Sequence, residues 1–358
     1  MNPTEWEMAV LEAVRAVEAV DGDFERLAWE RLDSLTKPPR SLGRLEELAA
    51  RVAVIQRDVR PDVSTKAVVL MAGDHGVVAQ GVAAYPQSVT AQMVANFATG
   101  GAAISQLASH AGARLVLVDV GVAADVSNVP GVRDVKIAWG TKDMTEGPAM
   151  TREEASRAFM AGVDIARELA AEGVRLIATG EMGIGNTTAA AAVTSALTGA
   201  RPEDVVGPGT GLGADGVARK TDAVRRALAV NAPDASDPLG VVASVGGLEI
   251  AGLAGVIVGG AAAGVCVISD GFISGAATLV AVRMCPACAG YVLPSHRSAE
   301  PGHRVVLEAL GLEPVFDLDM RLGEGSGAAL AMSIVEAACR VMSGMATFGE
   351  AGVSTRED

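Results

Sequence analysis

A loop rich in glycine and threonine is the first place in this 358-residue chain where residue types and spacing suggest chemistry. Its sequence, Gly-Ile-Gly-Asn-Thr-Thr at 183–188, follows an apolar stretch and precedes an alanine-rich one. A loop between a strand and a helix N-terminus presents free N–H groups and the helix dipole, which favour a phosphate. The alternative is a tight connection without a ligand. The loop ends in neither a Walker A lysine nor a dinucleotide fingerprint. Lys220 could supply countercharge, although a solvated helix lysine is commoner.

Three carboxylates are candidates for acid–base or binding chemistry. Glu324 lies between glycines at 323–327, and Glu181 lies just before the phosphate-type loop. A carboxylate in a dry cleft can have its pKa raised and act as a general base, whereas the alternative is a simple interaction with a helix dipole. Asp270 is the only charged residue between 250 and 282, so its burial requires a polar contact. Ribose hydroxyls are one such partner, and a helix cap is the alternative.

Two further motifs could hold a metal. Cys285 and Cys288 form a lone C-x-x-C, and the downstream His296 and His303 lie outside the spacing usual for zinc, which favours a structural role. The turn Gly-Asp-His-Gly at 73–76 offers a ligand pair without an evident third ligand. We therefore expect no metal site, and we expect the turn to shape the floor of a cleft.

The elements predicted around these residues alternate between strand and helix, an order that is typical of a parallel α/β sheet. Apolar stretches at 66–72, 114–120, 174–179, 264–269 and 314–319 predict strands, with helices between them, and the first 60 residues read as helices. Ligands bind beyond the carboxyl ends of such strands. Because the loops at 73–76, 180–188, 270–271 and 323–327 all follow strands, we expect them to share one cleft.

Composition excludes several classes of partner. The chain has 29 Lys and Arg against 43 Asp and Glu, a net charge of -14, so nucleic acid and anionic membranes are not expected partners. Residues 250–269 are uncharged and long enough to cross a bilayer, but their glycines and the absence of flanking basic and aromatic anchors favour buried helix and strand. Four cysteines and an acidic N-terminal stretch without signal-peptide features favour the cytoplasm.

Taken together, the loops resemble the nicotinate-nucleotide:dimethylbenzimidazole phosphoribosyltransferase family, which assembles the lower-ligand nucleotide of cobalamin. The matching stretches keep the family's order along nearly the whole chain. They are Thr-Lys-Pro-Pro-Arg-Ser-Leu-Gly at 36–43, Ala-Gly-Asp-His-Gly at 72–76, Val-Thr-Ala-Gln at 89–92, Gly-Glu-Met-Gly-Ile-Gly-Asn-Thr-Thr at 180–188, Gly-Pro-Gly-Thr-Gly at 207–211, Asp-Gly-Phe at 270–272, Ser-His-Arg-Ser at 295–298 and Leu-Gly-Glu-Gly-Ser-Gly at 322–327.

The resemblance implies a reaction between nicotinate mononucleotide and 5,6-dimethylbenzimidazole that gives α-ribazole 5′-phosphate and nicotinate, without a cofactor or metal. It implies that Glu324 is the general base and Glu181 a supporting carboxylate. The resemblance further assigns the 5′-phosphate to Gly183, Gly185 and Lys220 with Thr187 and Thr188 nearby, the ribose-phosphate to Asp270 and Ser298, and the base pocket to Ser88, Gln92, Met182 and Leu322.

The resemblance also implies an architecture and an assembly. The expected fold is a three-layer α/β/α domain with a mostly parallel sheet at 66–329, plus a smaller helical domain from 1–65 that 330–358 joins. The expected assembly is a homodimer. The acceptor base stays open, because the pocket varies within the family. The rival interpretation is a non-catalytic α/β protein that binds or senses a phosphate ligand and does not need Glu324.

Overall fold

The protein is built on one sheet of six strands, seen in a computed structural model that describes residues 4–354. The order is β3-β2-β1-β4-β5-β6 and every pair is parallel. Strands β1, β4, β5 and β6 are completely buried, as expected when helices cover both faces. The strands are β1 (Lys66–Gly73), β2 (Ala113–Gly121), β3 (Val132–Asp134), β4 (Leu176–Met182), β5 (Cys266–Ser269) and β6 (Val292–Pro294).

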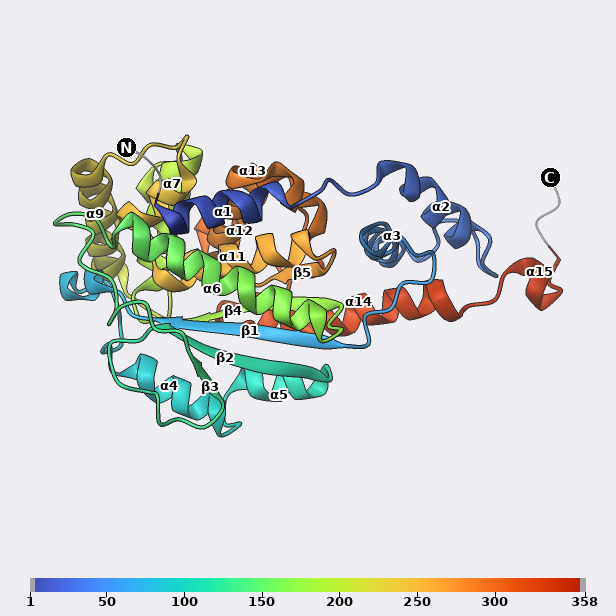
Figure 1. Cartoon of the computed structure of the whole chain (residues 1–358), viewed down its shortest axis with the longest axis horizontal. Coiled ribbons are helices and arrows are strands. Elements are labelled where there is room, and N and C mark those ends of the chain that lie inside the picture. Colours follow the sequence, from blue (N-terminus) through green and yellow to red (C-terminus); the bar gives the residue numbers. More distant parts are fainter. Residues whose placement is uncertain (1–3, 355–358) are drawn as a thin grey trace.

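Helices form a layer on each face of the sheet, which confirms the predicted three-layer α/β/α fold (Figure 1). One face carries α4 (Val89–Ala98), α5 (Ala103–His110) and α14 (Ser326–Gly344), and the other carries α6 (Arg152–Ala171) and α11 (Leu248–Ala262). The other helices are α1 (Glu5–Arg15), α2 (Gly22–Asp33), α3 (Arg44–Gln56), η1 (Gly76–Gln80), α7 (Asn186–Thr198), α8 (Pro202–Val205), α9 (Ala214–Asn231), α10 (Pro238–Val245), α12 (Phe272–Met284), η2 (Pro286–Tyr291), α13 (Pro301–Leu310) and α15 (Phe348–Ala351).

The uncharged stretch at 250–269 divides between α11 and β5, in agreement with the sequence-based prediction. Its glycines allow close helix packing, because a Cβ on Gly255 would overlap the carbonyl oxygen of Phe159 on α6. Within residues 4–354, only α14 has the length and hydropathy of a membrane span, and 50% of its most apolar window is buried in the protein.

The strand predicted at 314–319 is wrong. Asp317 and Asp319 interrupt the apolar pattern and lie at the surface, and Asp319 takes a positive φ of 54°. Only an isolated bridge between His296 and Phe316 forms there. The sheet edge is instead formed by the short strand β6.

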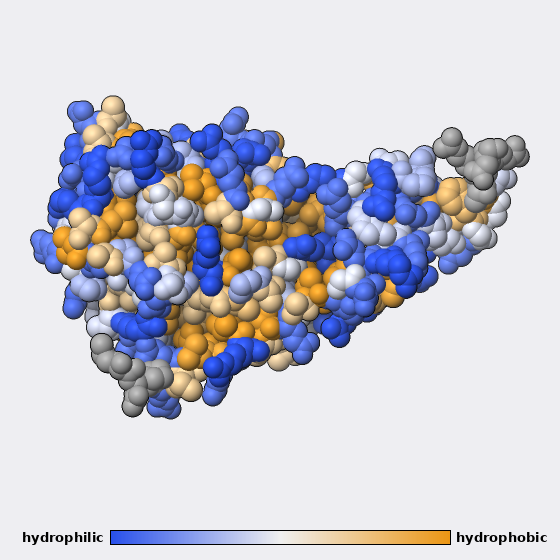
Figure 2. All heavy atoms as spheres, turned by 90° about the horizontal axis from the view of Figure 1, so that it is seen from above, coloured by the Kyte–Doolittle hydropathy of each residue, from blue (hydrophilic) through white to orange (hydrophobic). Residues whose placement is uncertain are grey.

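An arm made of α2, α3, α15 and the end of α14 projects from the sheet, and Figure 2 shows it as a narrow extension of the broader body. The arm joins the two ends of the chain, because Leu35 pairs with Thr347 and α3 packs on α14. Within the motif at 36–43, Lys37 forms a buried 2.8 Å ion pair with Glu46 that holds the loop. The α1 helix packs instead on α6 of the body. The division into two domains stays a prediction, and its residues 1–3 and 355–358 lie outside the described range.

Candidate active site

A cavity of about 670 Å³ lies beyond the carboxyl ends of the strands. The loops after β4 and β5 and the loop before α14 meet there, as the sequence predicted. The turn at 73–76 lies beneath them, because a Cβ on Gly183 would overlap the carbonyl oxygen of Gly73. The cavity is lined by Tyr85, Val89, Met93, Glu181, Met182, Gly183, Ile184, Asn186, Thr187, Gly209, Thr210, Gly271, Phe272, Ile273, His296, Ser298, Glu300, Arg321, Leu322, Gly323 and Glu324.

Glu324 is held in the cavity wall by an unusual backbone conformation. Its φ is 63°, a left-handed value that costs energy for a residue with a side chain and that is found preferentially at functional sites. The residue is 8% exposed, and its Oε2 has no hydrogen-bond partner among the described residues. Burial raises the pKa of the carboxyl, while the backbone N–H of Ile104 opposes the rise. A poorly solvated carboxylate of this kind is a strong proton acceptor.

Glu181 lies beside Glu324 and is bound to its backbone. Its Oε1 accepts a hydrogen bond from the Glu324 N–H at 3.4 Å, and its Oε2 accepts one from the Asn186 amide. Burial, followed by the nearby charges of Asp270 and Glu249, raises the pKa of Glu181 to about 8. Glu181 is therefore mostly protonated at neutral pH, which leaves Glu324 as the better candidate base.

Asp270 caps the helix that follows Glu324. Its Oδ1 accepts a hydrogen bond from the Ala328 N–H at 2.8 Å and its Oδ2 accepts one from the Gly325 N–H at 3.2 Å. The carboxylate is 1% exposed and does not line the cavity. These contacts match the alternative interpretation of Asp270 as a helix cap. The helix that it caps is α14, however, and not α12, the helix that follows Asp270 in sequence. The expected contact with the ribose-phosphate stays a prediction.

The proposed phosphate residues converge at one end of the cavity. A small hollow of about 40 Å³ there is lined in part by Gly183, Gly185, Thr187 and Lys220. The Lys220 ammonium donates to Thr187 Oγ1 at 2.6 Å, and burial lowers its pKa to about 8. Thr188 is the exception, because its side chain is buried in α7 and lines neither hollow.

The other end of the cavity is apolar and includes Met182 and Leu322, as expected. Ser88 and Gln92 do not line it. Helix α4 instead presents Val89 and Met93, which lie four residues apart on one helix face, and this turns residues 88 and 92 toward solvent.

Sequence reasoning missed several polar residues in the cavity. Glu300 accepts a hydrogen bond from the Gly209 N–H at 2.9 Å, and Arg321 donates to the Gly209 carbonyl at 3.3 Å. Both therefore hold the glycine loop at 207–211 beside the cavity. His296 also lines the wall, although the sequence drew attention to it only as a possible partner of the cysteines. Its place within the Ser-His-Arg-Ser motif was the available signal.

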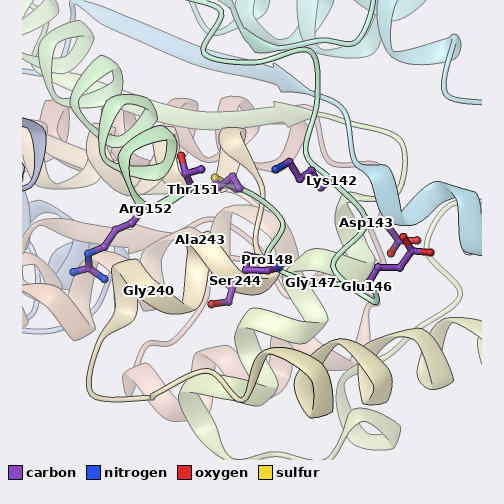
Figure 3. A pocket seen from close by; sticks show the side chains of 11 residues that line it. Lys142, Asp143, Glu146, Gly147, Pro148, Thr151, Arg152, Gly240, Ala243 and Ser244 are labelled. Atoms are coloured by element: carbon purple, nitrogen blue, oxygen red, sulfur yellow. The ribbon is translucent and has the colours of Figure 1, made fainter. Parts of the chain in front are cut away.

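A second hollow of about 670 Å³ does not have a comparable arrangement (Figure 3). Arg152 lies at one end of it and Asp143 and Glu146 lie at the other (Figure 3). Arg152 is also engaged in ion pairs with Glu7 and Asp237. These charged groups do not converge on a common point, so the carboxylate-lined cavity is the better candidate active site.

Comparison with known proteins agrees with this geometry. A family model described as a phosphoribosyltransferase matches residues 17–353. A nicotinate-nucleotide–dimethylbenzimidazole phosphoribosyltransferase of Chloroflexus aggregans is 51% identical over 97% of this chain and 98% of its own length. The enzyme of that name from Thermus thermophilus is 53% identical over 90% of this chain and 96% of its own length.

The fold is similar as well. A crystal structure of the Thermus thermophilus enzyme superposes with a TM-score of 0.89 at 51% identity, covering 94% of this chain and 100% of that one. These likenesses confirm the predicted family, fold class and enzyme class. The chain belongs to the nicotinate-nucleotide–dimethylbenzimidazole phosphoribosyltransferase family.

Proposed function

We propose that this chain transfers the phosphoribosyl group of nicotinate mononucleotide to 5,6-dimethylbenzimidazole, giving α-ribazole 5′-phosphate and nicotinate. The observation that carries the proposal is the buried Glu324 carboxylate, which lines the same cavity as a phosphate-type loop. A protein that only binds or senses a phosphate ligand needs the loop but does not need this carboxylate.

In the proposed reaction, Glu324 accepts the N–H proton of the benzimidazole while the other ring nitrogen attacks ribose C1′. The bond from C1′ to the nicotinate nitrogen breaks with inversion, and its electron pair neutralises the pyridinium ring. The raised pKa of Glu324 suits this step, because burial makes the carboxylate a stronger proton acceptor. Glu181 supports the step by holding the Glu324 backbone N–H.

The remaining residues bind the two substrates. Gly183, Gly185, Thr187 and Lys220 hold the 5′-phosphate, with charge supplied by the lysine and N–H groups supplied by the loop. Met182 and Leu322 cover the flat faces of the aromatic rings, together with Val89 and Met93. Ser298, which also lines the cavity, faces the ribose-phosphate.

The test is the release of nicotinate by the purified protein in the presence and absence of 5,6-dimethylbenzimidazole. Release should depend on the benzimidazole, and the Glu324→Gln variant should lower kcat by about 10² or more. Glu146→Gln, which changes a glutamate in the second hollow, is the matched control and should leave kcat unchanged.

Two results would count against the proposal. Nicotinate release that does not depend on the benzimidazole would favour the phosphate-binding interpretation or a different acceptor. Unchanged release by Glu324→Gln would move the role of base to Glu181.

We also infer a homodimer from the family resemblance, and a cytoplasmic location from the four cysteines. Light scattering on the eluate of a size-exclusion column should give a mass twice that of the 36.2 kDa chain. A monomeric mass for the active enzyme would reject the dimer.

A further inference from the structure

His296 occupies a position in the cavity wall to which the proposed mechanism gives no role. The imidazole stacks on Phe316 with ring centroids 5.9 Å apart, and the residue is 2% exposed. A Cβ on Gly327 would overlap its Nδ1, so the ring also lies directly against the first turn of α14. Such close packing fixes the orientation of the ring.

The hydrogen bonds of Ser295 determine which ring nitrogen carries the proton. Ser295 Oγ lies 3.2 Å from the Asp270 carbonyl oxygen and 2.9 Å from His296 Nδ1. The arrangement that satisfies all three groups gives the single hydroxyl proton to the carbonyl oxygen, which only accepts, and makes Nδ1 the donor to Oγ. The Asp270 carboxylate, 4.0 Å from Nδ1, favours the same tautomer.

In the neutral ring, this arrangement leaves a lone pair on Nε2. Within residues 4–354, Nε2 has no protein hydrogen-bond partner, and it is not among the unpartnered atoms that are sealed from solvent, unlike Nδ1 of His75. Because His296 lines the cavity, the lone pair is available to a hydrogen-bond donor on a bound substrate.

The position of His296 in the cavity indicates which part of the substrate this donor belongs to. The ring packs against Gly327, three residues after Glu324, beside which the bond at C1′ is proposed to change. Four residues after His296 in the chain, Glu300 holds the loop at 207–211, which lies near Lys220 and the proposed phosphate end. The group between C1′ and the 5′-phosphate is the ribose ring, whose hydroxyls are the donors in that part of the substrate.

We propose that His296 Nε2 accepts a hydrogen bond from a hydroxyl of the substrate ribose and thereby selects a ribosyl over a deoxyribosyl donor. The inference rests on the proposed function, because it takes nicotinate mononucleotide as the substrate. It assigns to His296 a binding contact, with Ser295 fixing the tautomer that makes the contact possible.

The test combines two changes to the protein with changes to the substrate. Nicotinate mononucleotide and its 2′-deoxy and 3′-deoxy analogues are assayed with wild type, His296→Asn and His296→Gln. Asparagine can keep the bond to Ser295 but lacks an atom at the Nε2 position, whereas the glutamine amide reaches it. The intrinsic reactivity of each analogue cancels when the enzymes are compared on the same analogue.

Replacing the normal donor by one of the two deoxy analogues should lower kcat/KM of wild type about tenfold more than it lowers kcat/KM of His296→Asn. The loss for His296→Gln should lie between these two losses, because the glutamine amide replaces part of the contact. Equal losses for all three enzymes on both analogues would overturn the proposal, even if wild type turns over the normal substrate. A purely structural role predicts that His296→Asn lowers kcat/KM by the same factor on all three donors. Failure of wild type to release nicotinate from the normal donor would instead reject the proposed function.

Discussion

Two loops with similar sequences, Gly-Ile-Gly-Asn at 183–186 and Gly-Glu-Gly-Ser at 323–326, begin helices at the same cavity. In each loop the second glycine has a left-handed φ, 93° at Gly185 and 84° at Gly325, and directly precedes a buried helix. The N-terminus of α7 is left for a ligand, with Lys220 beside it. The N-terminus of α14 is already occupied by the Asp270 carboxylate.

This difference shows that local sequence does not decide what a helix N-terminus does. An anion bound at α14 would compete with Asp270, so that loop is suited to present a carboxylate of its own and not to bind phosphate. The residue between the two glycines also differs between the loops. It is the apolar Ile184 in the anion-binding loop and the charged Glu324 in the loop that supplies the base. The buried side chain of Asp270, which directly follows β5, therefore distinguishes an anion-binding loop from a loop that supplies a base.

Among the changes that test this comparison, Asp270→Asn should have the largest effect, because it removes the charge that distinguishes the two helix termini. The asparagine has only one side-chain oxygen for the two N–H groups, so the loop at 323–327 should shift. A displacement of about 1 Å at a catalytic group lowers kcat by about 10². Losing a hydrogen bond to a charged group should lower the free energy of unfolding by about 2 kcal/mol. Urea denaturation and steady-state kinetics measure the two effects.

Asp317→Asn, which changes an exposed aspartate, is the control and should alter neither quantity. A different outcome, in which Asp270→Asn raises KM for nicotinate mononucleotide and leaves kcat intact, would show that Asp270 contacts the ribose-phosphate, as the family resemblance implied.

The sequence predicted the main features of the fold because they depend on local patterns. Apolar stretches alternating with helical ones predicted four of the six strands, and the glycine loops at their carboxyl ends predicted the common cleft. The strand predicted at 314–319 was wrong because its apolar residues alternate with aspartates that lie at the surface outside the sheet. The true edge strand, β6, was not predicted because its three residues are too few to give a pattern.

The details of the site were harder to predict because they depend on which way side chains point. Val89 and Met93 line the cavity in place of Ser88 and Gln92, and this rests on the rotation of α4 about its axis. The cap that Asp270 provides for α14 joins residues more than 50 positions apart, so no local motif signals it. The role of Ser295 beside His296 likewise emerges only from the packing of their neighbours.

A smaller effect is expected from Lys220→Met, which removes the charge at the anion-binding loop but keeps the shape of the side chain. KM for nicotinate mononucleotide should rise by about 10- to 100-fold, because that factor corresponds to the loss of one charge-assisted hydrogen bond. The value of kcat should change much less. This is the reverse of the pattern expected for Asp270→Asn. Initial rates over a range of donor concentrations separate the two parameters, with Lys142→Met as the control.

The effect of pH provides a second test of Lys220. Because burial lowers the pKa of Lys220 to about 8, the free enzyme should lose this charge, and kcat/KM should fall, as the pH rises through about 8. Glu181 has a pKa near the same value. The fall in kcat/KM should be absent in Lys220→Met; if it persists there, the titrating group is Glu181.

The smallest effect concerns backbone strain, and it should have opposite signs in the two loops. Glycine adopts a left-handed φ without strain, whereas alanine pays about 1 kcal/mol or more. At position 324, where φ is 63°, the glycine variant should therefore be more stable than the alanine variant by about 1 kcal/mol. Ile184 is not among the residues with positive φ, so at position 184 the alanine variant should be more stable than the glycine variant by about 0.5–1 kcal/mol.

Urea unfolding of the four variants measures both differences in the free energy of unfolding. Comparing glycine with alanine at one site removes most of the effect of losing the original side chain. If alanine were the more stable residue at 324 as well, the backbone there would not be strained. If the expected signs are found, then of these two loops only the one that supplies the base tolerates backbone strain, because a carboxylate is needed where glycine would fit better.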